Sequence, residues 1–152
     1  MSVVKSAEPD ATEPGFTRWP WWRRWFGRRS ERAAAGFLRR LGYRILAANV
    51  SDAAGELDLL ALDGETLVIV EVRSTASDRP DALNTTAATV DLRKQRKITG
   101  ATLRFLAKRH LLGKIAVRFD VLVMSWPAHK REPIVKHIPH AFEATGKFQL
   151  FT

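Results

Sequence analysis

Three carboxylate side chains, those of Glu56, Asp58 and Glu71, stand in one largely apolar stretch, residues 55–73 (GELDLLALDGETLVIVEVR). Carboxylates gathered on one face repel one another, and Mg²⁺ or Mn²⁺, which prefer oxygen ligands, would relieve that repulsion. The same pattern also fits an ordinary sheet face that carries solvated charge, since one-sided polar strands are common. The stretch therefore predicts either a metal site or a plain exposed face.

Alternating side chains on both sides of Asp63-Gly64 predict two strands joined by a tight turn. Asp-Gly is typical of a two-residue hairpin loop, because both central residues of a type I′ turn need a positive φ. With these two residues as the loop, Glu56 is predicted to lie opposite Glu71. Asp58 and Glu71 then become diagonal neighbours, with Cα atoms roughly 7–8 Å apart.

Composition favours a single basic domain. A chain of 152 residues is long enough for a real core. Its net charge of +9 predicts a polyanionic partner, nucleic acid before membrane. The chain has no cysteine, which excludes disulfides and cysteine-based zinc sites. There is no apolar run of about 20 residues and no apolar signal segment, so the predicted location is the cytoplasm.

Charge is distributed unevenly along the chain. Residues 51–90 hold eight acidic residues against two basic ones, and residues 86–114 hold eight basic residues against one acidic residue. An acidic centre beside a basic surface suits a metal site next to a phosphate-binding track. A dipolar surface without a catalytic role fits the same distribution.

Residues 1–29 are predicted to be a flexible extension, and residues 30–152 the folded domain. The segment FTRWPWWRRWFGRR (residues 16–29) contains four of the five tryptophans and five arginines. Arginine binds phosphate, while indoles stack on bases or lie at a membrane interface. Three alternatives stay open for this segment: a nucleic-acid-binding arm, a membrane-surface anchor, or an extension packed on the domain.

A helix is predicted over residues 30–41, with Ser30 as N-cap and Gly42 at the C′ position. Glu31 lies in its first turn, where a carboxylate interacts favourably with the helix dipole. The apolar stripe of this helix contains Ala34, Phe37, Leu38 and Leu41.

A longer helix is predicted over residues 86–109. Its apolar stripe also contains Lys94. This lysine either lies at the edge of the stripe with its ammonium in solvent, or points at the carboxylates if the helix packs over the hairpin. The apolar positions are Val90, Ile98, Ala101, Phe105 and Leu106, and the predicted phosphate contacts come from Arg93, Lys94, Arg96, Lys97 and Arg104.

The remaining segments complete an α/β sandwich, in which a mixed central sheet has a helix on each side. His110, His129, His137 and His140 show no metal-ligand spacing and are predicted to be surface or loop residues. Strands are predicted over residues 43–49, 115–124 and 133–138, loops over 50–54 and 74–85, and a helical turn over 140–144.

Several motifs in order resemble the YraN-like uncharacterised family. Residues 55–73 are similar to its G-E-I-D-L-I, acidic turn and F-V-E-V-K signature. Residues 31–49 are similar to its E-x-x-A-x-x-x-L-x-x-x-G-Y-x-I-L-x-x-N pattern, and residues 94–106 to its K-x-x-R-I-x-x-A-x-x-x-L helix. The sequences RFDV (118–121) and HAF (140–142) match as well. The resemblance therefore extends from about Glu31 to Phe142.

This resemblance implies a restriction-endonuclease-like three-layer sandwich, related to Holliday-junction resolvases and other PD-(D/E)-x-K nucleases. In that group the motif aspartate and glutamate bind Mg²⁺, and a lysine orients the attacking water. The positions that match are Asp58 and Glu71, with Glu31 as the helix glutamate that often completes the site. Glu56 matches a family glutamate whose role is less clear.

The chain departs from the family pattern at Arg73, which occupies the position of the motif lysine. Arginine can hold a phosphate but cannot give up a proton. Lys94 could supply the missing ammonium from the neighbouring helix. The resulting hypothesis is a Mg²⁺- or Mn²⁺-dependent nuclease acting on DNA, branched or damaged DNA included. A DNA-binding module with a decayed site and a membrane-surface protein remain alternatives, and the sequence leaves the oligomeric state open, a dimer included.

Overall fold

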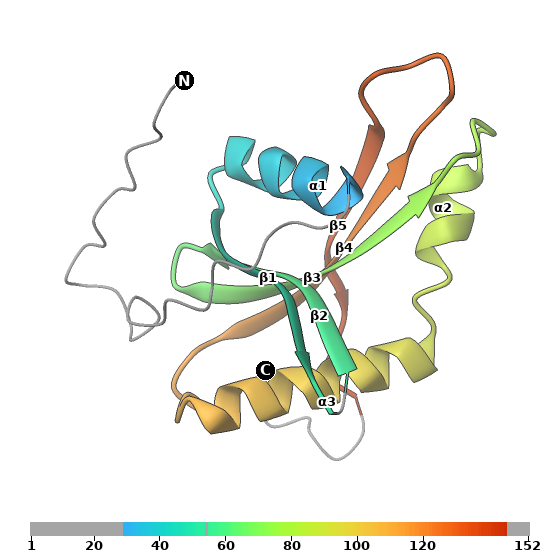
Figure 1. Ribbon diagram of the computed structural model, residues 1–152. Helices are drawn as coiled ribbons and strands as arrows, with labels where there is room; N and C mark the ends of the chain where they lie inside the picture. Colours follow the sequence, from blue (N-terminus) through green and yellow to red (C-terminus); the bar gives the residue numbers. More distant parts are fainter. Residues whose placement is uncertain (1–28, 54, 146–152) are drawn as a thin grey trace.

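The structure, a computed structural model, describes residues 29–53 and 55–145 of the chain. The predicted extension, residues 1–29, falls outside these ranges except for its last residue. Within them one five-stranded sheet is flanked by helices on both faces (Figure 1). In chain order the elements are α1 (Arg29–Arg40), β1 (Arg44–Asp52), β2 (Gly55–Asp63), β3 (Thr66–Thr75), α2 (Ala82–Ala87), α3 (Leu92–Lys108), β4 (Val117–Ser125) and β5 (Ile134–Phe142).

The sheet is mixed and follows chain order, β1-β2-β3-β4-β5. Strands β3 and β4 are parallel, and the other neighbours are antiparallel. A parallel pair needs a crossover, which α2 and α3 supply. Helix α1 lies on one side of the sheet and α3 on the other (Figure 1). This arrangement confirms the predicted α/β sandwich and is consistent with a restriction-endonuclease-like fold.

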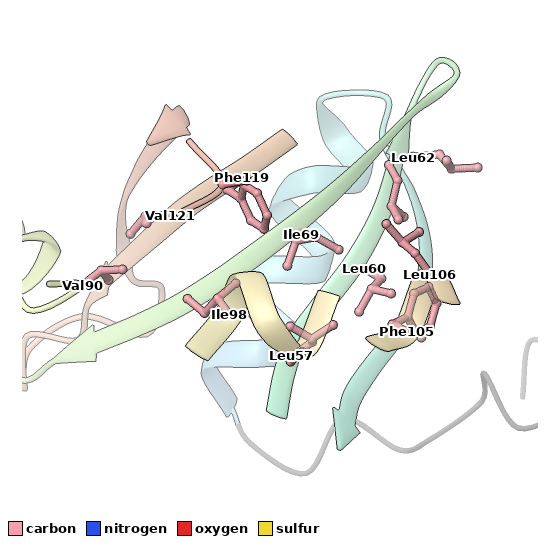
Figure 2. Close-up of a cluster of buried hydrophobic side chains, with 14 of the residues drawn as sticks. Leu57, Leu60, Leu62, Ile69, Val90, Ile98, Phe105, Leu106, Phe119 and Val121 are labelled. Atoms are coloured by element: carbon pink, nitrogen blue, oxygen red, sulfur yellow. The ribbon is translucent and has the colours of Figure 1, made fainter. Parts of the chain in front are cut away.

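Two apolar layers hold the helices to the sheet. The layer between the sheet and α3 contains every apolar position predicted for the long helix (Figure 2). The layer under α1 is built from smaller side chains, among them Ala34, Ala48, Leu59, Val70 and Leu122. Leu41, predicted to belong to the apolar stripe of α1, is instead 52% exposed. The helix therefore contacts the sheet over a short, closely packed face.

The hairpin loop differs from the predicted one by one residue. Asp63 pairs with Thr66, so Gly64 and Glu65 form the loop, and of these two only Gly64 has a positive φ, 59°. A two-residue turn with glycine at its first central position can connect the strands of a hairpin, as a type I′ turn can. The predicted register, in which Glu56 lies opposite Glu71, is therefore wrong.

The predicted long helix, residues 86–109, begins too early, and the loop predicted over residues 74–85 is wrong where α2 begins. Helix α2 covers Ala82–Ala87, and α3 begins at Leu92 with Asp91 as its N-cap. The Asp91 carboxylate accepts a hydrogen bond from the backbone N–H of Lys94 at 2.9 Å. An aspartate that satisfies a free N–H of the first turn is a strong helix start, and the prediction overlooked it. Lys94 thus lies in the first turn of α3.

The ends of several other elements also differ from the predictions. The predicted helical turn over residues 140–144 is mostly strand, because β5 continues to Phe142. The predicted loop after residue 49 is strand as far as Asp52. Ser30 lies inside α1, where its hydroxyl accepts a hydrogen bond from the Trp126 indole at 2.9 Å. Gly42, with a φ of 91°, ends α1 as predicted.

Candidate functional site

The pair of Leu59 with Val70 is the last β2–β3 pair at the end away from the hairpin loop, and the acidic site begins beyond it. Beyond that point the Asp58 carboxylate accepts a hydrogen bond from the backbone N–H of Val72, with Oδ2 and N 2.9 Å apart. A side chain thus replaces the backbone acceptor that β2 would have offered to β3. This bond fixes one carboxylate oxygen of Asp58 at the opening between the strands.

Glu71, on β3, is 4% exposed, and one oxygen of its carboxylate faces two cations. Oε1 lies 3.3 Å from Nζ of Lys94 and 3.4 Å from Nε of Arg73. Burial and the neighbouring Asp58 charge raise the pKa of Glu71 to about 7, although Lys94 and Arg73 oppose the rise. The two cations therefore only partly offset the cost of burying a second carboxylate beside Asp58.

Lys94 reaches this site because α3 packs against the hairpin. Its side chain is 33% exposed, and its ammonium contacts Glu71. The sequence allowed the Lys94 ammonium to lie in solvent or to point at the carboxylates. In the structure it points at the Glu71 carboxylate. Whether Lys94 takes part in chemistry stays a prediction.

Glu31 is buried in the first turn of α1, at 3% exposure. Its Oε2 accepts a hydrogen bond from Nδ2 of Asn49 at 2.9 Å. Asn49 has a φ of 52°, a conformation that asparagine tolerates better than most residues. At this residue β1 changes face, since Ala48 packs under α1 and Val50 packs toward α3.

The partnership of Glu31 with Asn49 was not predicted from the sequence. An asparagine at the end of the predicted strand, directly before Val50, was the available signal, because asparagine is depleted in regular strands. Interaction with the helix dipole is therefore not the whole account of Glu31.

A pocket of about 260 Å³ brings Glu31 and Asp58 together. Its lining also includes Arg29, Ser30, Val72, Ser74 and Trp126. Asp58 therefore has two acidic neighbours: Glu31 lines the same pocket, and Glu71 lies beside it on the side of Lys94. Within residues 29–53 and 55–145, no three histidine, aspartate or glutamate side chains are grouped so as to hold a metal ion. Asp58 and Glu71 form a two-carboxylate donor set, which fits Mg²⁺ because this ion keeps several water ligands.

Not every predicted site residue joins the cluster. Glu56 was predicted to lie opposite Glu71, but it is exposed, beyond the last β2–β3 pair, with Ser51 of β1 as its Cα partner. Four of the predicted phosphate contacts on α3 are exposed, namely Arg93, Arg96, Lys97 and Arg104, and Arg104 forms an ion pair with Asp52 at 3.3 Å.

A second polar cluster joins β4 and β5 under α1. Asp120, fully buried, accepts two hydrogen bonds from the Arg118 guanidinium at 2.8 and 2.9 Å. Nε2 of His137 lies 2.7 Å from the same carboxylate. Burial works against ionisation of Asp120, but hydrogen bonds with His137 and Arg118 lower its pKa. The prediction that His137 is a surface or loop residue is wrong, because strand alternation in β5 turns it inward.

Comparison with known proteins gives a consistent match. Residues 30–124 match the profile of uncharacterised protein family UPF0102. A UPF0102 protein of Rhodopirellula baltica is 45% identical over 123 residues, which cover 79% of this chain and 71% of that protein. A UPF0102 protein of Geobacter metallireducens is 39% identical, covering 77% of this chain and 91% of that protein. One from Treponema pallidum is 36% identical, covering 74% and 88%. These names state the family and no activity.

Among the described residues, no helix has the length and apolar character needed to cross a membrane.

Proposed function

The chain belongs to uncharacterised protein family UPF0102, and we propose that it is a Mg²⁺- or Mn²⁺-dependent nuclease that binds DNA and hydrolyses phosphodiester bonds. The observation that carries the proposal is the contact between two carboxylates at the opening of the hairpin. Asp58 is fixed there by a backbone N–H, and Glu71 is buried beside it. Burying one carboxylate beside another is costly unless a cation binds between them.

Different residues of the site would have different roles in such a reaction. Asp58 and Glu71 would hold the metal, and Glu31 lies in the same pocket as Asp58. A metal bound there would polarise a phosphoryl oxygen and lower the pKa of its bound water. Lys94, 3.3 Å from Glu71, would orient the attacking water by donating a hydrogen bond. Arg73, which keeps its charge, would hold the scissile phosphate.

A DNA-binding module with a decayed site is the second candidate. Arg73 favours it, because arginine occupies the position where the family pattern has lysine. Lys94 and Arg73 also already lie against the carboxylate that a metal would need. In this alternative the two cations take the place of the metal.

Calorimetric titration with Mn²⁺ tests the proposal. The parent protein should bind the ion, and Asp58→Asn and Glu71→Gln should lose binding while keeping the fold. Glu65→Gln, in the exposed hairpin loop, is the matched control and should bind as the parent does. Unchanged binding in both site variants would rule out this metal site.

Cleavage of single-stranded, duplex and branched DNA with Mn²⁺ then separates the two candidates. For an active enzyme, Lys94→Met should abolish cleavage and leave DNA binding nearly intact. For a site silenced by Arg73, the parent should be inactive and Arg73→Lys should create cleavage. If the parent and both variants cleave equally well, neither lysine argument is correct.

A further inference from the structure

A groove of about 610 Å³ runs between the outer side of α1 and the chain segment that connects β4 to β5. It is separate from α3, where the sequence predicted phosphate contacts, because α3 lies on the other side of the sheet (Figure 1). The residues that define it are Arg32, Gly36 and Arg40 of α1, together with Trp126, Arg131 and Glu132.

The charge of the groove is mainly positive. Three exposed arginines, Arg32, Arg40 and Arg131, line it, against the single carboxylate of Glu132. In the part of the chain that the structure describes, none of these three guanidinium groups forms an ion pair. Uncompensated charges of one sign in a concave surface attract a ligand of the opposite sign.

The spacing of these cations suits a repeating anion. Arg32, Gly36 and Arg40 are four residues apart, so they form one row along α1. The helical rise between the two arginines is about 12 Å, more than one isolated anion spans. Gly36, between them, carries no side chain and leaves the floor of the groove open. A Cβ at that position would lie 3.6 Å from Nη1 of Arg40, an ordinary contact.

The groove borders the acidic pocket at Trp126. Trp126 lines both of them, and Glu31, which faces the pocket, directly precedes Arg32 in α1. At the junction the Arg29 guanidinium lies 3.7 Å over the Trp126 ring and donates a hydrogen bond to the backbone carbonyl of Arg131 at 3.1 Å. A row of cations therefore leads to the edge of the pocket that contains Asp58.

We propose that this groove binds the phosphodiester backbone of one nucleic-acid strand where the strand runs to or from the acidic site. The inference rests on the proposed function, and it adds the path of the substrate. The strand contacts α1 and the β4–β5 connection through phosphates, so binding in the groove is independent of base sequence.

The first test measures the affinity for a short single-stranded oligodeoxynucleotide over a range of salt concentrations, without divalent metal so that cleavage cannot occur. The full-length double variant Arg32→Gln/Arg40→Gln loses two phosphate contacts. The slope of log affinity against log salt should then become shallower by about 1.4, since each single-strand phosphate contributes about 0.7. Arg93→Gln/Arg96→Gln removes the same charge from α3, where the sequence also predicts phosphate contacts, and so controls for the location of the contacts: a smaller change of slope in this variant assigns them to the groove.

A second pair of variants separates charge from shape. Gly36→Glu and Gly36→Gln place side chains of nearly equal size on the groove floor, and only the first adds a negative charge. We expect Gly36→Glu to bind the oligodeoxynucleotide roughly tenfold more weakly than Gly36→Gln, which corresponds to about 1.4 kcal/mol of like-charge repulsion. Neither variant touches Asp58 or Glu71, so both should keep the Mn²⁺ affinity of the parent.

The outcomes distinguish this inference from the proposed function. If the parent binds DNA, the Arg32/Arg40 variant keeps its slope and the Gly36 pair bind equally, the groove is not the path of the strand. The proposed function would then still stand, and a loss in the Arg93/Arg96 control would assign the contacts to α3. If the parent binds no DNA at all, the proposed function fails and the groove inference fails with it.

Discussion

Replacing Glu71 by glutamine should stabilise the protein at neutral and alkaline pH and leave it nearly unchanged in acid. The pKa of Glu71 rises from its ordinary value of 4.5 to about 7 in the folded state. Between these values the folded chain holds a proton that the unfolded chain has released, so stability falls as pH rises through this window. Glutamine resembles the protonated carboxyl and avoids that loss.

The magnitude follows from the same pKa values. The rise from 4.5 to about 7 converts, at about 1.36 kcal/mol per pH unit, into roughly 3 kcal/mol at pH values above the window. The contacts of Lys94 and Arg73 are already included, because they oppose the rise. For a domain of this size, that difference corresponds to a shift in Tm on the order of 10 °C.

Thermal unfolding at about pH 4 and about pH 8, without divalent metal, measures this difference. Comparing Glu71→Gln with the parent at each pH cancels the titration of all other groups, and Glu65→Gln controls for the loss of one exposed negative charge. The reasoning is refuted if Glu71→Gln is no more stable than the parent at about pH 8, or if its advantage is the same at both pH values.

Adding Mg²⁺ or Mn²⁺ extends the same experiment. A metal that binds only the folded state stabilises it by about 2.7 kcal/mol at a concentration one hundred times its Kd. The bound ion requires a deprotonated Glu71, so stabilisation of the parent should grow as pH rises. Glu71→Gln should gain much less, and its advantage over the parent should shrink when metal is present.

Three further variants test other parts of the structure by denaturant unfolding. Asp120→Asn should cost about 3–5 kcal/mol, because it removes the buried carboxylate beside the Arg118 guanidinium and leaves that cation paired with Asp63 alone. Since the pKa of Asp120 is lowered, its stabilising contribution is present above its unfolded pKa and disappears as the pH falls through its folded pKa, and an unchanged acid limb in the variant would contradict this. Asn49→Gly should keep the backbone at a φ of 52° and lose only the bond to Glu31, whereas Asn49→Ala should cost roughly 1 kcal/mol more through strain; equal losses would show that this conformation is not costly for alanine. Gly36→Ala should stabilise α1 by about 0.5–1 kcal/mol, because the added Cβ meets no closer atom than 3.6 Å; destabilisation would mean that the groove floor is tighter than this spacing.

The sequence was sufficient for the architecture and for the neighbourhood of the two main carboxylates. Strand alternation and the apolar stripe of α3 determine which residues face the sheet, and those positions are buried. The hairpin register depends on a single loop residue, however, and the Asp-Gly signal fits a loop that begins at either residue. Shifting the loop by one residue changed the register of the whole hairpin, so Glu56 does not lie opposite Glu71 and stays outside the cluster.

Features that depend on contacts between distant segments were not predictable in the same way. His137 lies beside Asp120 because β5 pairs with β4 in antiparallel register, with His137 opposite Leu122, and nothing in the local pattern of β5 specifies that partner. Trp126 contributes to the site by donating a hydrogen bond to Ser30, a residue 96 positions away in the chain. Such pairs follow from the fold, so they can be identified only once the sheet order is known.

The arrangement of cations around Glu71 offers a physical explanation for an arginine, Arg73, at the position where the family pattern has lysine. Nζ of Lys94 and Nε of Arg73 reach the same Glu71 oxygen from two different elements, at 3.3 and 3.4 Å. A positive charge beside the Glu71 carboxylate offsets part of its negative charge, whether the charge comes from β3 or from α3. The two cations differ in proton exchange, since an ammonium can release a proton when its surroundings lower its pKa and a guanidinium cannot. In the proposed reaction Lys94 is therefore the hydrogen-bond donor to the attacking water, and Arg73 can remain at the motif position as a permanent charge for the phosphate.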